Sequence, residues 1–382
     1  MMKEVIVLPT RPLVTTQTHD VSVPKPAKDQ VLIRVVVAAS NPKDYKHVLS
    51  TGTAINSGDD AAGIIEDLGS SVESSGQFRR GDRVAIFHAM MTPGGTYAEY
   101  ALAPATTVLL LPQWISFECS LPWSDIFRPC ILAYFSTAAS TIPLTTLAAA
   151  LPLFRRQSLP APWMKRSTNA APLPLIVYGA SSALGSFAIK LARHANIHPI
   201  IAIAGGSSDY IKQFLDYSRG DALVDYRNGA DVLKSDVKKA LNGLQAFHAL
   251  DAISESKSWV QVAQMLSGGV VSVVQGSEKY DEPDIPANVE ISYSFVGSAH
   301  SGKFLSSMPK QPSDKSSVEA DVEFSYVLIN YISRLLSKHE FEGHPFEVIP
   351  GGLAGIELGL QKLQRGEAKA VKYVYRIVDG VA

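Results

Sequence analysis

Cysteine is almost absent from this chain, which has two in 382 residues, Cys119 and Cys130. Two cysteines cannot build a disulfide framework, and without a CxxC pair or a Cys/His cluster they cannot build a structural zinc lobe. Clustered positive charge is lacking too, since the formal net charge is -1 and no basic stripe is present. We therefore expect a reducing compartment, and neither a nucleic acid nor an acidic membrane surface as the partner.

A signal-peptide core is also missing, because MMKEVIVLPTRP has a charge pair and then too few apolar residues. We therefore expect a cytoplasmic protein. Pro129–Phe154 carries no charged residue over about one bilayer thickness. It also contains Pro143 and Pro152 and many hydroxyl side chains, so we expect a buried segment or an interdomain helix rather than a membrane span.

The chain does have the length and the apolar content, 46% of its residues, for two domains that each bury a core. Its first hundred or so residues form short β-prone runs separated by turn residues, and no convincing helical periodicity interrupts them. The expected strands are Glu4–Leu8, Gln30–Ala39, Ala61–Leu68, Arg83–His88 and Thr96–Ala103. This pattern predicts a β-rich first domain.

From Pro174 the pattern changes to strands that alternate with helices, which predicts a parallel, doubly wound sheet. The expected strands are Leu175–Tyr178, His198–Ala204, Ala222–Val224, Ala246–Ala249, Gly269–Gln275 and Asn288–Val296. The expected helices are Ser182–Arg193, Asp209–Arg219, Ala230–Leu241 and Lys257–Leu266. After them we expect an exposed loop over Ser301–Asp321, helices over Val322–Leu336 and Leu353–Leu363, and a strand over Ala370–Val378 that returns to the first domain.

Leu175 to Arg193 has the form of a dinucleotide-binding unit, with a short apolar strand, a turn of small residues and an amphipathic helix. In such a unit small residues let the backbone approach a pyrophosphate, and the helix N-terminus offers N–H groups to the anion. A plain strand-turn-helix is the alternative, because the turn departs from G-x-G-x-x-G. The expected cofactor contacts, with Ser182 as a hydrogen-bond donor, are Gly179, Ala180, Ser181, Ser182, Ala183, Leu184 and Gly185.

The end of the strand His198–Ala204 predicts which cofactor is used. An acid there would bind a ribose 2′-hydroxyl and repel a 2′-phosphate. The strand is followed instead by two glycines, then Ser207 and Ser208, with Lys212 one helical turn on. Hydroxyls and a cation suit a phosphate, so we favour NADPH over NADH. Asp209 argues the other way, unless it serves as an early helical acid that complements the helix dipole.

Four motifs in order precede this unit. They read N-P-K-D at 41–44, D-A-A-G-I-I at 60–65, G-D-R-V at 81–84 and G-G-T-Y-A-E-Y at 94–100, and G-G-L at 351–353 and K-A-V-K-Y-V at 369–374 follow later. Together they resemble the zinc-free quinone oxidoreductase and enoyl reductase branch of the medium-chain dehydrogenase/reductase superfamily. The combination is most similar to fungal dehydrogenases and trans-acting enoyl reductases associated with polyketide pathways.

The resemblance implies an α/β fold with a GroES-like β-rich substrate domain at residues 1–150, a doubly wound Rossmann NADPH-binding domain at 151–320 and a C-terminal return to the catalytic domain at 321–382. It also implies cofactor contacts from Tyr226 and Arg227, in a stretch where relatives place a tyrosine against the adenine ribose phosphate. Val274 and Gln275, at the end of an expected strand, complete the expected contacts.

One stretch breaks the resemblance. Relatives would run almost directly from I-S-F-E at 115–118 to A-A-S-T at 138–141, whereas residues 119–137 intervene here. These residues are either an ordinary surface insertion or the translation of an intron retained in the gene model. A mature transcript that always contains codons 119 to 137 would exclude the intron.

Zinc-dependent relatives place a cysteine near the N-P-K-D position and G-H-E a little further on. The matching stretches here, residues 41–44 and Gly58-Asp59-Asp60, offer neither cysteine nor histidine, and His47 and His88 are too isolated to rebuild a site. We therefore expect no metal. Without a Lewis acid, the most compatible reaction is hydride delivery from a reduced nicotinamide to an electron-poor alkene, because a conjugated carbonyl can accept the charge with hydrogen bonds alone.

The candidate catalytic residues are Asn41, Asp44, Tyr45 and Lys46, at and just after the N-P-K-D turn. Tyr45 and Lys46 are either proton donors or oxyanion partners, or exposed residues that open a helix. Asn41 either orients the nicotinamide or the substrate, or caps the turn. The sequence leaves the proton donor open.

We therefore expect an NADPH-dependent, zinc-independent oxidoreductase that reduces an enoyl or enone group on a small-molecule or carrier-bound acyl substrate. A polyketide synthase is the candidate partner, and the assembly is a monomer or a homodimer. A quinone or carbonyl/alcohol oxidoreductase and a noncatalytic NADPH-binding partner protein remain as alternatives. A short-chain dehydrogenase and a P-loop phosphotransferase are excluded, because Y-x-x-x-K and G-K-[ST] are absent.

Overall fold

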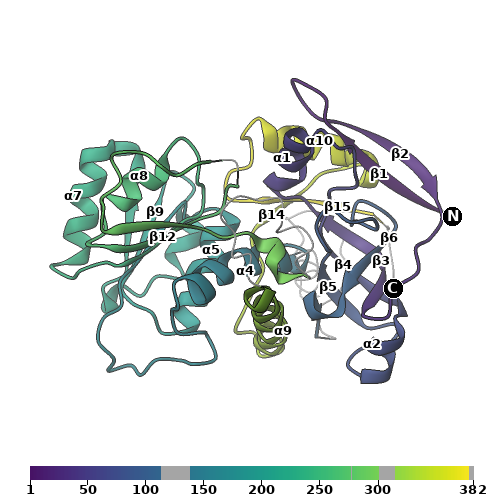
Figure 1. The fold of residues 1–382 in the computed structure, drawn as a ribbon, viewed down its shortest axis with the longest axis horizontal. Helices are drawn as coiled ribbons and strands as arrows, with labels where there is room; N and C mark the ends of the chain where they lie inside the picture. The colour runs from purple at the N-terminus through teal and green to yellow at the C-terminus, as the bar shows by residue number, and fades with distance from the viewer. Residues whose placement is uncertain (113–137, 277, 301–314, 378–382) are drawn as a thin grey trace, which may run out of the picture. The chain divides into compact units, whose positions relative to one another are not determined.

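The computed structural model describes residues 1–112, 138–276, 278–300 and 315–377. The chain divides into two compact units, one made of Met1–Leu144, Ala299–Ser301 and Val322–Ala382, the other of Thr145–Ser298 and Gly302–Asp321. In Figure 1 the purple N-terminal strands and the yellow C-terminal elements belong to the first unit, and the teal and green strands belong to the second. Residues 119–137, which break the resemblance, lie outside the described residues.

The first unit is built on a mixed sheet that, in the described part of the chain, has seven strands and carries a large apolar core. β3 is its central strand and pairs antiparallel with β4, β6 and β15. Since β15 lies near the end of the chain, the final strand returns to the N-terminal sheet. The strands are β3 (Gln30–Ala39), β4 (Asp60–Leu68), β5 (Arg83–Phe87), β6 (Tyr100–Pro104), β7 (Val108–Leu110), β14 (Phe346–Val348) and β15 (Lys372–Arg376).

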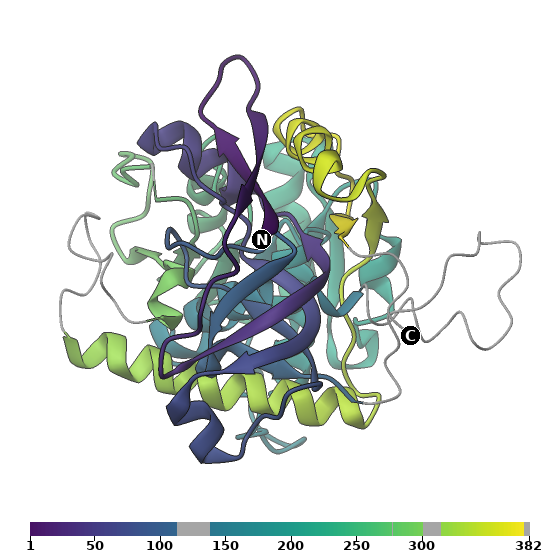
Figure 2. The ribbon, with the colours of Figure 1, turned by 90° about the vertical axis from the view of Figure 1, so that its right-hand side faces the viewer.

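Two further elements of this unit are a hairpin and a helix. A hairpin of β1 (Met2–Leu8) and β2 (Thr15–Val21) stands apart from the sheet and is seen at the top of Figure 2. Helix α1 (Pro42–Thr51) follows β3, starts with a proline whose missing N–H costs nothing there, and ends at Gly52 in the left-handed conformation. It contacts α10 (Ile356–Gln364) and β1.

The described part of the second unit is a six-stranded sheet in the order β10-β9-β8-β11-β12-β13, with every pair parallel. The strand order reverses between β8 and β11. In sheets of this kind ligands bind at the carboxyl ends of the strands beside such a reversal. The strands are β8 (Leu175–Tyr178), β9 (Ile200–Ala204), β10 (Ala222–Asp225), β11 (His248–Asp251), β12 (Gly269–Val273) and β13 (Val289–Tyr293).

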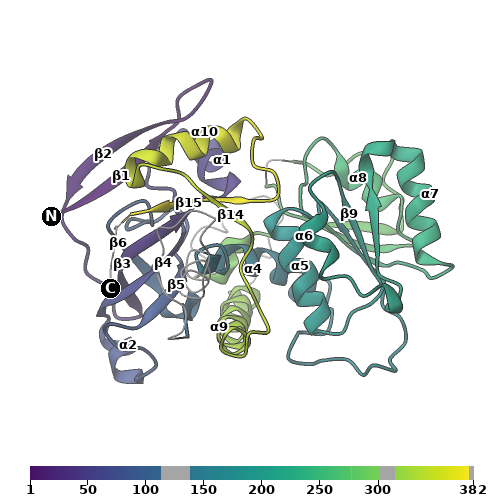
Figure 3. The same ribbon diagram turned by 180° about the vertical axis from the view of Figure 1, so that it is seen from behind.

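Helices cover both faces of this sheet. α7 (Ala230–Leu241) and α8 (Ser258–Ala263) share an apolar core with one face, through Val237 and Trp259 among others. α5 (Ala183–His194) connects β8 to β9, a step toward the β10 edge of the sheet, whereas α8 connects β11 to β12, a step toward the β13 edge. Because such connections are right-handed, steps in opposite directions place their helices on opposite faces of the sheet. Figure 3 shows α5 and α6 (Asp209–Lys212) in front of the sheet.

The predicted α/β class is confirmed, and β3, β8 and α7 begin and end at the predicted residues. The other predicted strands are present with shifted ends. The expectation that no helix interrupts the β-rich region is wrong, since α1 does so. β2 was not predicted because its residues are mostly polar and exposed, and the helix predicted over Asp209–Arg219 ends at Lys212.

The loop predicted over Ser301–Asp321 is wrong for its last seven residues, 315–321, which are helical. Residues 301–314 lie outside the described residues. α9 (Lys315–Ser337) already contains Asp321, which is buried and accepts hydrogen bonds from Arg155 Nε and Arg156 Nη1 at 3.0 Å. The described part of the uncharged stretch forms α4 (Pro143–Ala150) and the start of a π-helical turn over Leu151–Arg156, and both are largely buried. Over the described ranges, no helix has the length and apolarity to span a membrane.

Gly63 tests how tightly β3 and β4 are packed. A Cβ placed on Gly63 would lie 2.1 Å from the carbonyl oxygen of Arg34 in the neighbouring strand. We expect Gly63→Ala to lower the free energy of unfolding by about 3 kcal/mol, because the strands must separate to admit the methyl group. The measurement is urea unfolding of both proteins.

The matched control is Gly76→Ala, where a Cβ would meet no heavy atom within 4 Å although φ is +69°. We expect this change to cost only about 1 kcal/mol of left-handed backbone strain. Equal losses for the two variants would contradict the close approach at Gly63.

Candidate functional site

The turn after β8 brings the backbone close to its surroundings at two glycines. Gly179 has φ +74°, and a Cβ on it would lie 2.5 Å from Cγ1 of Ile253. A Cβ on Gly185, in the first turn of α5, would lie 2.4 Å from the carbonyl oxygen of Gly179. The helix therefore starts directly against the turn. The first N–H groups of a helix have no partner within the helix, and Ser182 caps one of those of α5.

The serines of this turn differ in their roles. Ser182 is the N-cap of α5, and its Oγ accepts a hydrogen bond from the Gly185 N–H at 3.0 Å. Its hydroxyl proton is still available for donation. Ser181 Oγ is buried and has no hydrogen-bond partner among the described residues. An unpaired buried hydroxyl costs free energy, so a partner from a ligand fits this position beside the glycine cradle.

The predicted residues Tyr226 and Arg227 follow β10 and reach the end of β9. A Cβ on Gly206 would lie 2.9 Å from Nη1 of Arg227, and one on Gly205 would lie 3.0 Å from Cε1 of Tyr226. The Tyr226 ring also contacts that of Tyr178 at the end of β8, with 5.9 Å between centroids. An exposed guanidinium and an aromatic ring thus flank the glycines where the sequence predicts a ribose phosphate.

Both cations predicted for this phosphate already have acidic neighbours. Arg227 Nη2 pairs with Asp225 at 2.6 Å, and this hydrogen-bonded pairing lowers the pKa of Asp225 to about 2. Lys212 pairs with Asp209 at 2.7 Å within α6, and both side chains are exposed. Ser207 and Ser208 lie between the glycines and this helix. Water screens such exposed pairs strongly, so a phosphate can compete for either cation.

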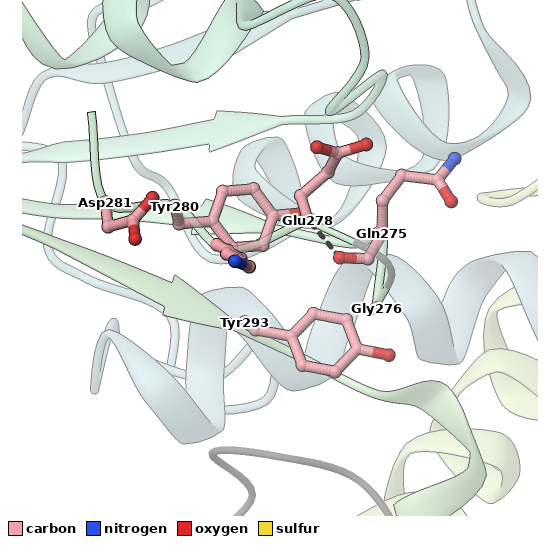
Figure 4. Close-up of a pocket in the computed structure, with 7 residues that line it drawn as sticks. Gln275, Gly276, Glu278, Tyr280, Asp281 and Tyr293 are labelled. Atoms are coloured by element: carbon pink, nitrogen blue, oxygen red, sulfur yellow. Dashed lines mark hydrogen bonds between the residues drawn. The ribbon is translucent and has the colours of Figure 1, made fainter.

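Val274 and Gln275 lie at the carboxyl end of β12, on the other side of the strand-order reversal from Arg227. Ser254 Oγ accepts a hydrogen bond from the Val274 N–H at 3.0 Å. Gln275 lines a pocket of about 220 Å³ together with the rings of Tyr280 and Tyr293, as Figure 4 shows. The Tyr280 hydroxyl donates to the Gln275 carbonyl at 2.5 Å, which closes one side of this pocket.

In the first unit, the start of α1 forms a cluster of buried charged groups that we call the aspartate cluster; it consists of Asn41, Lys43, Asp44, Asp59, Asp60, Tyr97 and Lys372. Asp44 is fully buried, and its Oδ2 accepts hydrogen bonds from the Asn41 N–H at 2.8 Å and the Tyr97 hydroxyl at 2.6 Å. The predicted residues Asn41 and Asp44 are therefore held together, inside the protein.

Lys43 pairs with two of the buried carboxylates. Its Nζ lies 2.7 Å from Oδ1 of Asp44, forms an ion pair with Asp59, and donates to the Ser57 carbonyl at 2.6 Å. Burial alone would lower the pKa of Lys43, but the charges of Asp44 and Asp59 outweigh burial and raise it. Burial raises the pKa of Asp59 to about 7, against the opposing effect of Lys43.

Lys372 supplies the second cation of the cluster from β15. Its Nζ lies 2.7 Å from Oδ2 of Asp60 and donates to Oδ1 of Asn41 at 2.9 Å. Asn41 Nδ2 donates to the same Asp60 oxygen at 3.0 Å, and the Leu144 N–H donates to the other at 2.9 Å. The Asn41 amide therefore holds an aspartate and a lysine in place.

The other two predicted catalytic residues lie on the outer part of α1. Tyr45 is half-buried and packs against the apolar core, and Lys46 is half-buried beside it. Sequence reasoning missed Lys43, Asp59, Asp60 and Lys372 as members of a site. A signal was present, since Asp59-Asp60 and Lys372 each adjoin runs of apolar or aromatic residues where a charge needs a buried partner.

His47 and His88 lie in different surroundings. His88 Nδ1 lies 2.7 Å from the Leu102 carbonyl oxygen and Nε2 lies 3.1 Å from that of Thr92. Burial and then the charge of Lys43 lower the pKa of His47 to about 4, so this imidazole is neutral at pH 7. Within the described ranges, no group of three or more His, Cys, Asp or Glu side chains is arranged to hold a metal ion.

The chain is similar to known proteins along most of its length. The alcohol dehydrogenase GroES-like domain family matches residues 27–113. The trans-enoyl reductase fsr4 of Gibberella fujikuroi is 32% identical over 340 residues, which are 88% of each chain. The trans-enoyl reductase pvhC of Talaromyces variabilis is 28% identical over 366 residues, 94% of this chain and 92% of the relative.

Two solved structures share the fold of both units. An alcohol dehydrogenase superfamily protein from Novosphingobium aromaticivorans has a TM-score of 0.69 at 17% identity, covering 99% of this chain and 100% of that one. The CurK enoyl reductase has a TM-score of 0.64 at 16% identity, covering 97% and 98%. The fold is thus a GroES-like β-rich unit with a Rossmann-type parallel sheet. The chain belongs to the medium-chain dehydrogenase/reductase superfamily, in its enoyl reductase type, and is an oxidoreductase.

Proposed function

We propose that this protein is an NADPH-dependent, zinc-independent reductase of an activated C=C bond in an enoyl or enone substrate. The observation that carries the proposal is the position of Arg227 beside Gly206, at the end of the second parallel strand, together with the glycine cradle after the first. The relatives named trans-enoyl reductase support the C=C bond as the group reduced.

The second unit would bind the cofactor across the strand-order reversal. The N–H groups at the start of α5 and the Ser181 hydroxyl suit the pyrophosphate, because that turn offers free donors and no obstructing Cβ. Arg227, Tyr226 and Ser207 lie on one side of the reversal, where a 2′-phosphate would lie. Gln275 and its pocket lie on the other side, and we assign them to the nicotinamide half.

Zinc independence is supported by what fills the place of the metal ligands. The two stretches that carry cysteine and histidine in zinc-dependent relatives here carry Lys43, Asp44 and Asp59, and the lysine ammonium lies between the carboxylates. The cation in this part of the unit is thus a side chain. An enone or enoyl thioester suits such a site, since hydrogen bonds can stabilise its enolate without a Lewis acid.

The bound cofactor would supply the hydride, and the protein would supply orientation, exclusion of water and a proton. The first unit is the proposed substrate domain. Because several relatives are named trans-enoyl reductases, we propose an acyl chain bound to a carrier as the substrate and a polyketide synthase as the partner. The protein would act as a monomer or a homodimer.

The direct test is NADPH oxidation by the purified full-length chain with a panel of enoyl thioesters and enones, before and after dialysis against a chelator. We expect turnover with at least one conjugated substrate and no loss after dialysis. NADPH oxidation only with aldehydes or quinones, or NADP⁺ reduction only with alcohols, would contradict C=C reduction. Tight NADPH binding without any turnover would favour a noncatalytic partner protein.

Gly185→Val tests the cofactor turn. The side chain would meet the Gly179 carbonyl, so the start of α5 must move away from the pyrophosphate position. We expect NADPH affinity to fall by about 10-fold or more, measured by isothermal titration, because misplacing two or three N–H donors loses about 1–2 kcal/mol. Unchanged affinity would contradict the placement. A melting temperature measured without cofactor separates this effect from a general loss of folding.

Arg227→Gln tests the choice between NADPH and NADH. We expect the KM for NADPH to rise about 10- to 100-fold, which corresponds to losing one charged hydrogen bond to the phosphate, while the KM for NADH stays unchanged. Lys239→Gln is the control, because it removes another exposed cation that pairs with an aspartate, from α7 of the same unit. An equal rise for both cofactors would contradict a contact with the 2′-phosphate.

A further inference from the structure

The proposed reduction consumes a proton as well as a hydride, and the aspartate cluster contains ionisable groups that are buried from water. Three carboxylates, on Asp44, Asp59 and Asp60, face two ammonium groups, on Lys43 and Lys372. All three carboxylate side chains are at most 1% exposed. A buried excess of one negative charge is costly, and binding one proton removes it.

We propose that Lys43 donates this proton to the substrate and that Asp59 then returns a proton to Lys43. The proposal rests on the proposed function, since it needs the reduction of a conjugated C=C bond. It assigns a proton donor that the motifs leave open, and it makes Lys43 the catalytic residue and Asp59 the group that recharges it.

Lys43 has the most exposed side chain among the charged residues of the aspartate cluster, so it is the one that a substrate can reach. Its side chain is 16% exposed, whereas those of Asp59 and Lys372 are 1% and 5% exposed. Its Nζ touches Asp59 on one side and Asp44 on the other, so a proton can pass from acid to amine without a chain movement. The Ser57 carbonyl accepts a hydrogen bond from the same nitrogen, which fixes the end of this flexible side chain.

The step balances as follows. Hydride from the reduced nicotinamide forms a C–H bond at the β-carbon, the C=C pair moves toward the carbonyl, and an enolate results. An N–H bond of the Lys43 ammonium then breaks, and its proton forms the C–H bond at the α-carbon, a far stronger base than an amine. The neutral amine takes the carboxyl proton of Asp59, which leaves a lysine–carboxylate ion pair, and water recharges Asp59 after product release.

The groups around the pair set its pH dependence. Burial is the largest effect that favours the protonated form of Asp59, Lys43 opposes it, and the charges of Asp44 and Asp60 add to it. The Tyr97 hydroxyl donates a hydrogen bond to Asp44, and Lys372 forms an ion pair with Asp60. Burial, and to a smaller extent the charge of Lys43, lowers the pKa of His47 and of His88. The pKa of Asp59 is about 7, so its proton is present below that pH and lost above it. The rate limited by recharging therefore falls as pH rises through 7.

The main test is the pH profile of kcat for Asp59→Asn in the full-length protein, with NADPH and a conjugated substrate that the wild type reduces. We expect the wild-type kcat to fall above pH 7. In the variant we expect kcat at pH 6 to be lower by about 100-fold, as is typical when a general acid is lost, and to change little with pH. Asp29→Asn, an exposed acid of the same unit, is the control and should keep the wild-type profile.

A variant with normal melting temperature and the wild-type pH profile would overturn the proposal, since a purely structural role moves stability alone. A wild type that reduces no conjugated substrate would instead refute the proposed function. The two failures are therefore distinguishable.

A second test compares the single variant Lys43→Met with the double variant Lys43→Met/Asp59→Asn, in case Asp59→Asn alone fails to fold. Above pH 7 the double variant removes opposite charges together, so it is the better candidate to fold there. Because the two groups act one after the other on the same proton-transfer path, we expect both variants to lose the same factor in kcat and to show the same altered solvent isotope effect. Losses that multiply, with the isotope effect unchanged from wild type, would overturn the proposal.

Discussion

The first unit depends on the ion pairs between the buried carboxylates of the aspartate cluster and two lysines, Lys43 and Lys372. Asp44, Asp59 and Asp60 are removed from water, which is tolerated only when cations and hydrogen bonds surround them. Lys372 meets this need from a strand near the end of the chain, so the pair Asp60–Lys372 joins β4 to β15. Removing one partner of such a pair costs about 3–5 kcal/mol, which makes the C-terminal return part of the site.

The second unit meets the opposite requirement. An anion-binding turn needs free donors and open backbone, so its determinants are missing side chains at Gly179 and Gly185. The charged residues near the end of β9 are exposed, and Arg227 keeps an acidic neighbour, Asp225. Water screens that pair, so exchanging it for a phosphate costs little. In the proposed function, affinity comes from the open backbone of this turn, and the choice between cofactors comes from exposed side chains such as Arg227.

Local patterns predicted the elements of this chain better than its site. β3, β8 and α7 were predicted at their observed bounds because their periodicity is a property of consecutive residues. The cofactor turn is local as well. Asp60 and Lys372 are 312 residues apart, and only the pairing of β15 with β3 brings them together. Asn41 and Asp44 could be named from their motif, but the cations that keep them buried could not.

The charge count of the aspartate cluster explains why it suits one proton per turnover. With Asp59 protonated, two carboxylates face two ammonium groups and the cluster is neutral. Donation from Lys43 followed by transfer from Asp59 leaves two ammonium groups and three carboxylates. This is the state that the resting cluster reaches above pH 7, with each cation still paired. After the proton is donated, the cluster is therefore in an arrangement that the fold already stabilises. Its excess negative charge then favours protonation of Asp59 from water.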